Sequence, residues 1–248
     1  MEPPANVLIL GGTAEARELA AVLDADPAVR VISSLAGRVR QPLRPAGEVR
    51  IGGFDGPVGL AGWLAEHSIT AVVDATHPFA AVISANAVAG CRDAGVALIR
   101  LARPGWQPAP GDDWHPVESG AAAARLLPGL GTRIFLSTGS YQLAEFAPLP
   151  LWFLLRSIEP PHGPLPERCQ LLLSRGPFTL AGERELLREH RIDALVTKNS
   201  GGPLTSAKLL AARELRLPVV MISRPVNPDS VEVSDVEAAA SAVRAITG

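Results

Sequence analysis

The chain has 248 residues, of which 47% are hydrophobic, and its formal net charge at pH 7 is −2. A chain of this length and composition can bury one large core or two modest ones. It has no surplus of basic residues and only 4% aromatic residues. This balance argues against binding to nucleic acid or to an anionic membrane surface. We therefore expect neither as a partner.

The sequence indicates a cytoplasmic protein. Its two cysteines, Cys91 and Cys169, lie far apart and match neither a zinc-binding spacing nor a disulfide framework. The apolar run at residues 7–10 is too short for a signal peptide. No stretch approaches the roughly 18 apolar residues needed to span a membrane. We therefore expect no metal site and no membrane segment.

Short aliphatic runs alternate with stretches rich in Ala, Leu, Glu and Arg through most of the chain. This alternation predicts an α/β fold, in which parallel strands are buried on both faces and flanked by helices. The predicted strands are residues 7–10, 29–32, 71–74, 97–101, 133–136, 151–155, 194–197 and 219–222, with weaker patterns at 49–51 and 171–174. The predicted helices are residues 14–23, 57–67, 80–94, 141–146, 179–190, 206–215 and 236–246.

A proline- and glycine-rich stretch at residues 103–111 interrupts the alternation. Such a stretch can form neither a helix nor a central strand, so we interpret it as part of a linker between two domains. The predicted division is a first domain over residues 1–103, a linker over 104–116 and a second domain over 117–248. Each half has a glycine-containing turn after a strand, which favours two Rossmann-like halves with an active-site cleft between them.

The turn that follows the first predicted strand has the setting of a phosphate-binding loop. Its glycines let the backbone approach a diphosphate, and the first helical turn presents N–H groups to that anion. Thr13 and Ala16 stand where the pattern G-x-G-x-x-G has its second and third glycines. An ordinary tight turn capped by Thr13 is therefore the alternative. The predicted coenzyme-binding residues here are Gly11, Gly12, Thr13, Ala14 and Glu15.

The end of the second predicted strand indicates which coenzyme binds. NAD-dependent enzymes usually place an acidic residue about 20 residues after the glycines, where it binds the ribose 2′-hydroxyl. This chain has Ser34 and Arg38 in that region and no acidic residue. A hydroxyl and a guanidinium suit a 2′-phosphate, so we predict NADPH as the coenzyme. A polar loop in which Arg38 faces water is the alternative.

Asp74, Thr76 and His77 follow a buried strand, at the edge of the sheet where ligands bind in open α/β folds. His77 titrates near neutrality and could donate a proton while Asp74 orients it. Thr76 could cap the next helix or contact the coenzyme. Alternatively, the three side chains satisfy one another and the helix terminus.

Three strands of the second half also end in polar or cationic residues. A hydroxyl-rich turn follows one, Arg175 follows another, and Lys198 ends the third. Such strand ends meet at one edge of a parallel sheet, so together they indicate a pocket for a ligand with several negative charges. Each has a structural alternative, such as a capping turn or a surface cation. The predicted substrate-binding residues are Ser137, Thr138, Gly139, Ser140, Arg175, Ser200, Gly201 and Lys208.

The order of these motifs resembles that of the precorrin-6A reductase family of cobalamin (vitamin B12) biosynthesis. The block at residues 74–80 is the most specific part, whereas Pro203, Leu204 and Thr205 interrupt the glycine pattern of the family after Gly201. The resemblance covers nearly the whole chain. It is carried by residues 9–16, 34–38, 74–80, 137–140, 197–201, 211–215 and 218–225.

The resemblance implies that the protein reduces one double bond of precorrin-6A with NAD(P)H to give precorrin-6B, or acts on cobalt-precorrin-6A in the related branch. It implies no metal or flavin. The first domain would bind NADPH, and the second would bind the tetrapyrrole through its acetate and propionate arms. Lys198 and His77 are then the candidate proton donors. We expect a monomer or a weak homo-oligomer.

Two further interpretations compete with this one. A short-chain dehydrogenase should carry a Tyr-x-x-x-Lys pair, whereas the single tyrosine, Tyr141, has Glu145 at that offset. A non-catalytic module could bind NADPH or a tetrapyrrole without turnover. Oxidation of NADPH in the presence of the macrocycle distinguishes an enzyme from such a module.

Overall fold

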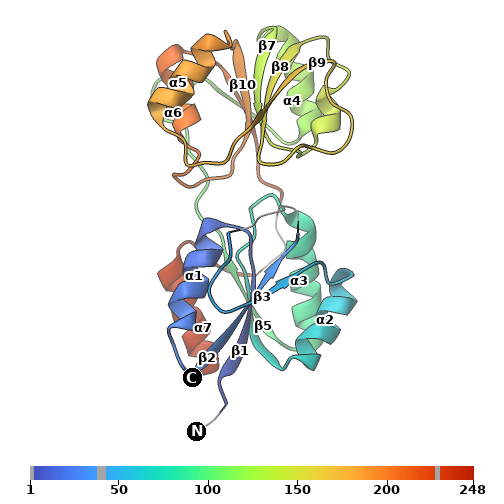
Figure 1. The fold of residues 1–248 in the computed structure, drawn as a ribbon, viewed down its shortest axis with the longest axis vertical. Helices are drawn as coiled ribbons and strands as arrows, with labels where there is room; N and C mark the ends of the chain where they lie inside the picture. Colours follow the sequence, from blue (N-terminus) through green and yellow to red (C-terminus); the bar gives the residue numbers. More distant parts are fainter. Residues whose placement is uncertain (1–2, 38–42, 227–229) are drawn as a thin grey trace. The chain divides into compact units, whose positions relative to one another are not determined.

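The computed structural model describes residues 3–37, 43–226 and 230–248 and divides into two compact units (Figure 1). Unit 1 comprises Met1–Pro104 and Pro225–Gly248, and unit 2 comprises Gly105–Arg224. Each unit contains a six-stranded sheet in which every pair of neighbouring strands is parallel. Helices cover the sheets, so the predicted class of parallel sheets flanked by helices is confirmed.

The sheet of unit 1 has the strand order β3-β2-β1-β4-β5-β12, which is the order of a dinucleotide-binding Rossmann fold. Its strands are β1 (Ala5–Leu10), β2 (Val29–Leu35), β3 (Glu48–Ile51), β4 (Ile69–Asp74), β5 (Ala97–Leu101) and β12 (Val231–Val233). Its helices are α1 (Ala14–Asp24), α2 (Gly56–Glu66), α3 (Ala81–Ala94) and α7 (Val236–Thr247).

Strand β1 shows why this sheet needs helices on both faces. Val7 and Ile9 pack into the layer of α1 and α7, whereas Leu8 and Leu10 pack into the layer of α2 and α3 (Figure 1). All four side chains are almost completely buried. A strand that is apolar on both faces is stable only between two layers, as the sequence predicted.

The sheet of unit 2 has the order β9-β8-β7-β10-β11-β6, with α5 and α6 packed against one face and α4 near the other. Its strands are β6 (Trp114–Val117), β7 (Arg133–Ser137), β8 (Trp152–Ser157), β9 (Arg168–Leu173), β10 (Ala194–Lys198) and β11 (Val219–Ile222). Its helices are α4 (Gly120–Leu126), α5 (Leu180–Glu189) and α6 (Ala207–Leu215), with short 3₁₀ helices η1 (Leu127–Gly129) and η2 (Leu143–Phe146).

Counted outward from β1 and from β7, the two sheets share the same strand order, but their sixth strands come from different places in the chain. Strand β12 follows unit 2 in sequence, whereas β6 precedes the other strands of its own sheet. The predicted division therefore differs from the structure at two points. Residues 225–248 group with unit 1 rather than with the second domain, and β6 lies partly within the stretch predicted as linker.

Most predicted elements are present, and the structure differs from the prediction at three points. The strands β6 and β12 were not predicted because both are short edge strands, and β6 contains Pro116. Residues 141–146, predicted as a helix, form only the four-residue 3₁₀ helix η2. Helix α4 was not predicted because its alanine-rich sequence lacks an apolar periodicity. Within the described ranges, no helix has the length and apolar character needed to cross a membrane.

A buried ion pair joins β8 to α5 in unit 2. The guanidinium of Arg156 donates hydrogen bonds of 3.0 and 2.7 Å to the two carboxylate oxygens of Glu183. Both side chains are at most 8% exposed, and Arg156 also lies over the rings of Phe135 and Phe178. Removing one member of such a pair leaves the other charge buried without compensation.

We therefore expect Glu183→Ala to lower the free energy of unfolding of unit 2 by about 3–5 kcal/mol. Urea unfolding followed by tryptophan fluorescence measures this change, because Trp106, Trp114 and Trp152 lie in unit 2. The matched control is Glu185→Ala, which removes a carboxylate from the same helix. Similar midpoints for the two variants would contradict the assigned role of the buried pair.

Candidate active site

Each sheet has a point at which its strand order reverses. In unit 1 the chain leaves β1 toward β2 and leaves β4 toward β5, in opposite directions across the sheet. In unit 2 the corresponding strands are β7 and β10. Ligands of open α/β sheets bind at such switch points, beyond the carboxyl ends of the strands. Four of the predicted motifs lie there, after Leu10, Asp74, Ser137 and Lys198.

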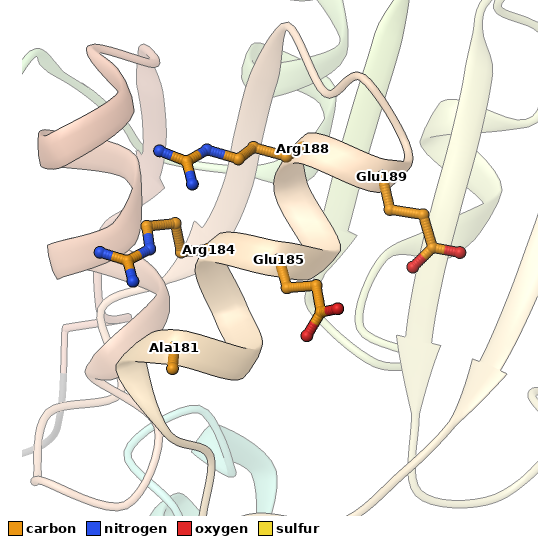
Figure 2. A pocket seen from close by; sticks show the side chains of 5 residues that line it. All are labelled: Ala181, Arg184, Glu185, Arg188 and Glu189. Carbon is orange, nitrogen blue, oxygen red and sulfur yellow. The ribbon is translucent and has the colours of Figure 1, made fainter.

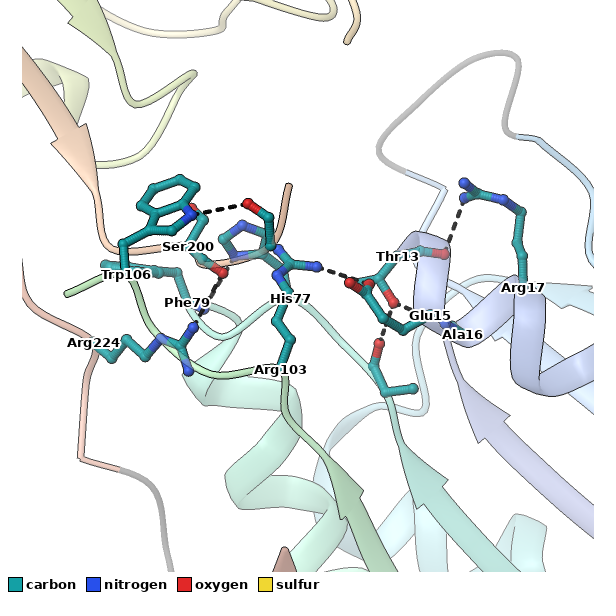
Figure 3. A network of polar contacts seen from close by, with 12 residues as sticks. Thr13, Glu15, Ala16, Arg17, His77, Phe79, Arg103, Trp106, Ser200 and Arg224 are labelled. Carbon is teal, nitrogen blue, oxygen red and sulfur yellow. Dashed lines mark hydrogen bonds and ion pairs between the residues drawn. The ribbon is translucent and has the colours of Figure 1, made fainter. Parts of the chain in front are cut away.

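The turn after β1 is built from close backbone contacts. The N–H of Gly11 donates to the carbonyl of Ser34 on β2 at 2.9 Å, and Gly12 has a φ of +112°, which favours glycine. Thr13 is the N-cap of α1: its hydroxyl accepts from the N–H of Ala16 at 3.1 Å. The same hydroxyl donates to the carbonyl of Ala75 at 2.7 Å, which joins this turn to the end of β4 (Figure 3).

This turn fits the diphosphate of a dinucleotide. The backbone N–H groups of Ala14 and Glu15 have no hydrogen-bond partner among the described residues, because the cap satisfies only Ala16. A Cβ added at Gly12 would meet no atom within 4 Å, so space is open beside the turn. The carboxylate of Glu15 is paired with Arg103 at 2.8 Å, which offsets its charge near this anion site (Figure 3).

The neighbouring strand end contains a cation that the sequence analysis did not single out. The hydroxyl of Ser34 on β2 accepts a 2.9 Å hydrogen bond from Arg50 on β3, and the two residues are partners in the ladder. Burial lowers the pKa of Arg50 below its usual value. The pattern of β3 was weak, so Arg50 resembled an ordinary polar position of a half-exposed strand. Arg38, predicted for this place, lies outside the described residues.

Asp74 is the centre of a buried network at the end of β4. One carboxylate oxygen accepts from the N–H and the hydroxyl of Thr76, at 3.1 and 2.6 Å. The other accepts from Arg100 on β5 at 2.9 Å, and both members of this ion pair are at most 5% exposed. Arg100 is in turn 3.4 Å from Glu232 on β12. Thr76 and Arg100 thus occupy the oxygens that were expected to orient His77.

The segment after Asp74 orients His77 in a different way. The N–H of Phe79 donates to Nδ1 of the imidazole at 3.2 Å. Nδ1 can accept this bond only when it carries no proton, so a neutral His77 has its proton on Nε2. The ring is therefore arranged to donate from Nε2.

The switch point of unit 2 lacks the helix that follows the corresponding strand in unit 1. After Ser137 the chain turns through Gly139, whose φ is +61°, and continues into η2 rather than an α-helix. Thr138 is 2% exposed, whereas Ser140 is exposed. A four-residue 3₁₀ helix does not offer the dipole and the N–H groups of the 11-residue α1. The turn after β7 therefore lacks the helix N-terminus that follows β1 in unit 1.

The loop after Lys198 is held in place at both of its sides. Asn199 exchanges two hydrogen bonds with the backbone of Trp106, and the indole N–H of Trp106 donates to Gly202 at 2.9 Å. Arg224 donates to the carbonyl of Asn199. It also donates to the carbonyl of Ser200 (Figure 3). Gly201 and Gly202 have positive φ values, which permit the sharp turn. The ammonium of Lys198 lies 5.3 Å from the centre of the Tyr141 ring.

The chain contains only two lysines, Lys198 and Lys208, and the structure gives them different surroundings. Lys208 was predicted to hold substrate, but its side chain is 4% exposed. Its ammonium donates to the carbonyl of Thr205 at 2.6 Å and lies 4.8 Å from the ring centre of Trp106. In this conformation Lys208 therefore supports the loop that precedes α6. Arg175 follows the edge strand β9 and is exposed.

An open hollow of about 520 Å³ lies on the outer side of α5 (Figure 2). It is lined by Ala181, Arg184, Glu185, Arg188 and Glu189. These residues lie on one helix, carry charges of both signs and belong to neither switch point. A solvated helix surface explains this hollow better than a ligand site does.

Comparisons with known proteins agree with this geometry. A family model described as "Precorrin-6x reductase CbiJ/CobK" matches residues 6–244. The chain is 55% identical over 244 residues to a precorrin-6A reductase of Rhodococcus erythropolis, covering 98% of each chain. It is 30% identical to a cobalt-precorrin-6A reductase of Salmonella typhimurium, covering 89% of this chain and 88% of that protein. A solved structure of CobK precorrin-6A reductase superimposes with a TM-score of 0.91 at 43% identity, covering 98% of this chain and 97% of that one.

The burial of Lys208 has a consequence for stability. Desolvation lowers the pKa of Lys208 from 10.5 to about 7, against a smaller opposing effect of Glu183. Between these two pH values the unfolded chain binds more protons at this residue than the folded protein does. Burial of the charged ammonium therefore lowers the free energy of unfolding by its full amount below about pH 7. This loss is relieved as the pH rises toward 10.

We expect Lys208→Met to remove this contribution to the pH dependence. The free energy of unfolding of the wild type, relative to that of the variant, should increase by a few kcal/mol between about pH 7 and pH 10. Urea unfolding at a series of pH values measures the difference, in which the titration of all other groups cancels. A constant difference across that range would show that Lys208 titrates normally.

Proposed function

Because this chain belongs to the precorrin-6A reductase family, we propose that NADPH is the reductant with which it converts precorrin-6A to precorrin-6B in cobalamin biosynthesis. The observation that carries this proposal is the match to precorrin-6A reductases over nearly the whole length of the chain. A dinucleotide-binding turn in unit 1 and cationic strand ends in unit 2 supply the two kinds of site that such a reaction requires. We place the reaction in the cytoplasm and expect a monomer or a weak homo-oligomer.

Sequence identity favours the metal-free macrocycle as the substrate. The relatives named precorrin-6A reductase are 45–55% identical to this chain, whereas those named cobalt-precorrin-6A reductase are 30–31% identical. Reduction of cobalt-precorrin-6A is the alternative. Both substrates would present the same carboxylate arms to the protein, so the residues proposed to bind the macrocycle would serve either one.

Unit 1 is proposed to bind the coenzyme. The N–H groups of Ala14 and Glu15 would hold the diphosphate, and Gly12 would leave room for it. Ser34 lies beside this turn and would contact the ribose that carries the 2′-phosphate. Thr13 and Thr76 would hold the turn and the end of β4 in place through their own hydrogen bonds. When bound, NADPH supplies the hydride.

Unit 2 is proposed to bind the macrocycle. Lys198 and Arg175 would attract its acetate and propionate groups, and the hydroxyls of Ser137 and Ser140 could donate to the same groups. Ser200 and Gly201 belong to the loop held by Trp106 and Arg224, which would present backbone groups in a constant geometry. Lys208 would act indirectly, by supporting this loop from its buried position.

Addition of a hydride to one atom of the conjugated system places an electron pair on its partner atom, and a proton must neutralise that pair. Lys198 is the better candidate donor, because an ammonium at a strand end can give up a proton and regain it from water. His77 can donate a hydrogen bond from Nε2 in its neutral form. To act as an acid it must be protonated on both nitrogens, which breaks the contact with the N–H of Phe79. We therefore assign orientation of the ligand to His77 and proton delivery to Lys198.

The proposed reaction predicts that the purified protein consumes NADPH only when precorrin-6A is present. Loss of NADPH absorbance under anaerobic conditions measures turnover, and mass spectrometry of the macrocycle should show a gain of two hydrogens. The kcat/KM with NADPH should exceed that with NADH by at least about tenfold, because a 2′-phosphate offers charge-assisted hydrogen bonds. Binding of the macrocycle without turnover would instead identify a non-catalytic module.

We expect Lys198→Met to lower kcat by about 10²–10⁴, which is the usual contribution of a positioned acid. Lys198→Arg should have a KM for precorrin-6A close to that of the wild type, because it keeps the positive charge. Its kcat should stay low, because a guanidinium keeps its proton. His77→Asn should raise KM more than it lowers kcat. Arg184→Gln, on the outer side of α5, is the control. Unchanged kcat values for the variants at both positions would show that water delivers the proton.

A further inference from the structure

We propose that Arg50 binds the 2′-phosphate of NADPH and thereby selects NADPH over NADH, an assignment that rests on the proposed function above. Nothing in the sequence pattern of a dinucleotide-binding fold points to this residue, since it lies on β3 rather than at the end of β2. Arg50 is distinguished by the contacts that it makes, by the hydrogen bonds that it has left to donate, and by its difference from a second arginine on the same pair of strands.

The carboxyl ends of three adjacent strands place Arg50 in line with the phosphate-binding turn. Gly11, just after β1, donates to the carbonyl of Ser34 on β2, and the Ser34 hydroxyl accepts from Arg50 on β3. Neighbouring strands lie about 4.8 Å apart, so Arg50 is about two strand spacings from the turn. The ribose that carries the 2′-phosphate binds at the end of the second strand in this fold, which lies between the two.

The guanidinium of Arg50 is held in a defined orientation with donors to spare. Its Nη1 donates to Ser34 and to the carbonyl of Gly52, and its Nη2 donates to the carbonyl of Gly53. The group lies over the ring of Phe54, with 3.8 Å between the guanidinium carbon and the ring centre. Of its five N–H groups, these bonds use three. The Nε–H and the second Nη2–H have no hydrogen-bond partner among the described residues.

The two remaining donors suit a phosphate. Nε and Nη2 form one edge of the planar guanidinium, and that edge can donate two parallel hydrogen bonds to one phosphate group. The Ser34 hydroxyl already accepts from Arg50, so its own proton is directed to another acceptor, and a phosphate oxygen meets that need as well. In the sequence, neither residues 33–37 nor residues 49–54 include a carboxylate that would repel a 2′-phosphate.

Arg30 provides a contrast within the same two strands. It lies near the amino end of β2 and pairs with Glu48 at the beginning of β3, at the opposite edge of the sheet. Both members of that pair are more than half exposed. Arg50 therefore differs from Arg30 in what surrounds it: a hydroxyl, two carbonyls and an aromatic ring, and no carboxylate partner in the described part of the chain.

The test compares the binding of two small probes, 2′,5′-ADP and 5′-AMP, by isothermal titration calorimetry of the full chain. The probes differ only in the 2′-phosphate. We expect the wild type to prefer 2′,5′-ADP, and Arg50→Gln to weaken its binding by about ten- to hundredfold while 5′-AMP changes less than about twofold. Arg50→Lys should give an intermediate loss, since it keeps the charge but not the fork. Arg30→Gln should bind both probes as the wild type does.

Three results would overturn the assignment. One is that Arg50→Gln and Arg50→Lys weaken both probes equally, which would mean that Arg50 only holds the loop at Gly52 and Gly53. Another is that both Arg50 variants keep the wild-type preference for 2′,5′-ADP over 5′-AMP, whether or not Arg38→Gln loses it. If the wild type itself does not distinguish the probes, the proposed use of NADPH fails together with the assignment. Thermal unfolding of each variant identifies any general loss of structure.

Discussion

Burial of a parallel sheet on both faces is the constraint that organises each unit. A strand between two layers of helices cannot carry unpaired charges along its length, so polar groups collect where the strands end. Asp74 shows the limit of this rule, because its buried carboxylate is tolerated only with Arg100 and Thr76 on its oxygens. Where the strand order reverses, two such ends lie side by side and their connections diverge. Gly12 follows β1 at the switch point of unit 1, and Lys198 ends β10 at the switch point of unit 2.

The two units share one strand order but differ in a single connection, the one that follows β1 in unit 1 and β7 in unit 2. After β1 the chain enters an 11-residue helix, with a capping threonine and, among the described residues, two N–H groups without a partner in its first turn. After β7 it enters only a 3₁₀ turn, and the neighbouring strand β10 instead ends in Lys198. An array of backbone donors suits a compact diphosphate, whereas dispersed side-chain cations suit carboxylates spread around a large ring. The same strand order therefore offers different kinds of anion-binding group in the two units.

The sequence was sufficient to predict the central strands and the turns at the switch points, because uninterrupted aliphatic runs and glycine turns depend on local structure. It was not sufficient for features that depend on long-range pairing. Nothing in the Val231–Val233 segment indicates that it pairs with β5 rather than with a strand of unit 2. Arg50 and Lys208 show the same limitation for single side chains. One lies beside Ser34 and the other is buried under Trp106 only because distant segments pack together.

The exchange of sixth strands also affects the order in which the protein can fold during synthesis. Unit 2 is one continuous segment and can complete its sheet while the chain is still being extended. Unit 1 cannot, because Ala239, Ala240 and Val243 of α7 are fully buried in its core and are made after unit 2. Until they emerge from the ribosome, the apolar face of α1 and β5 lacks its cover. Unit 1 can thus finish folding only after unit 2 has been synthesised, and its nascent form exposes apolar surface during that time.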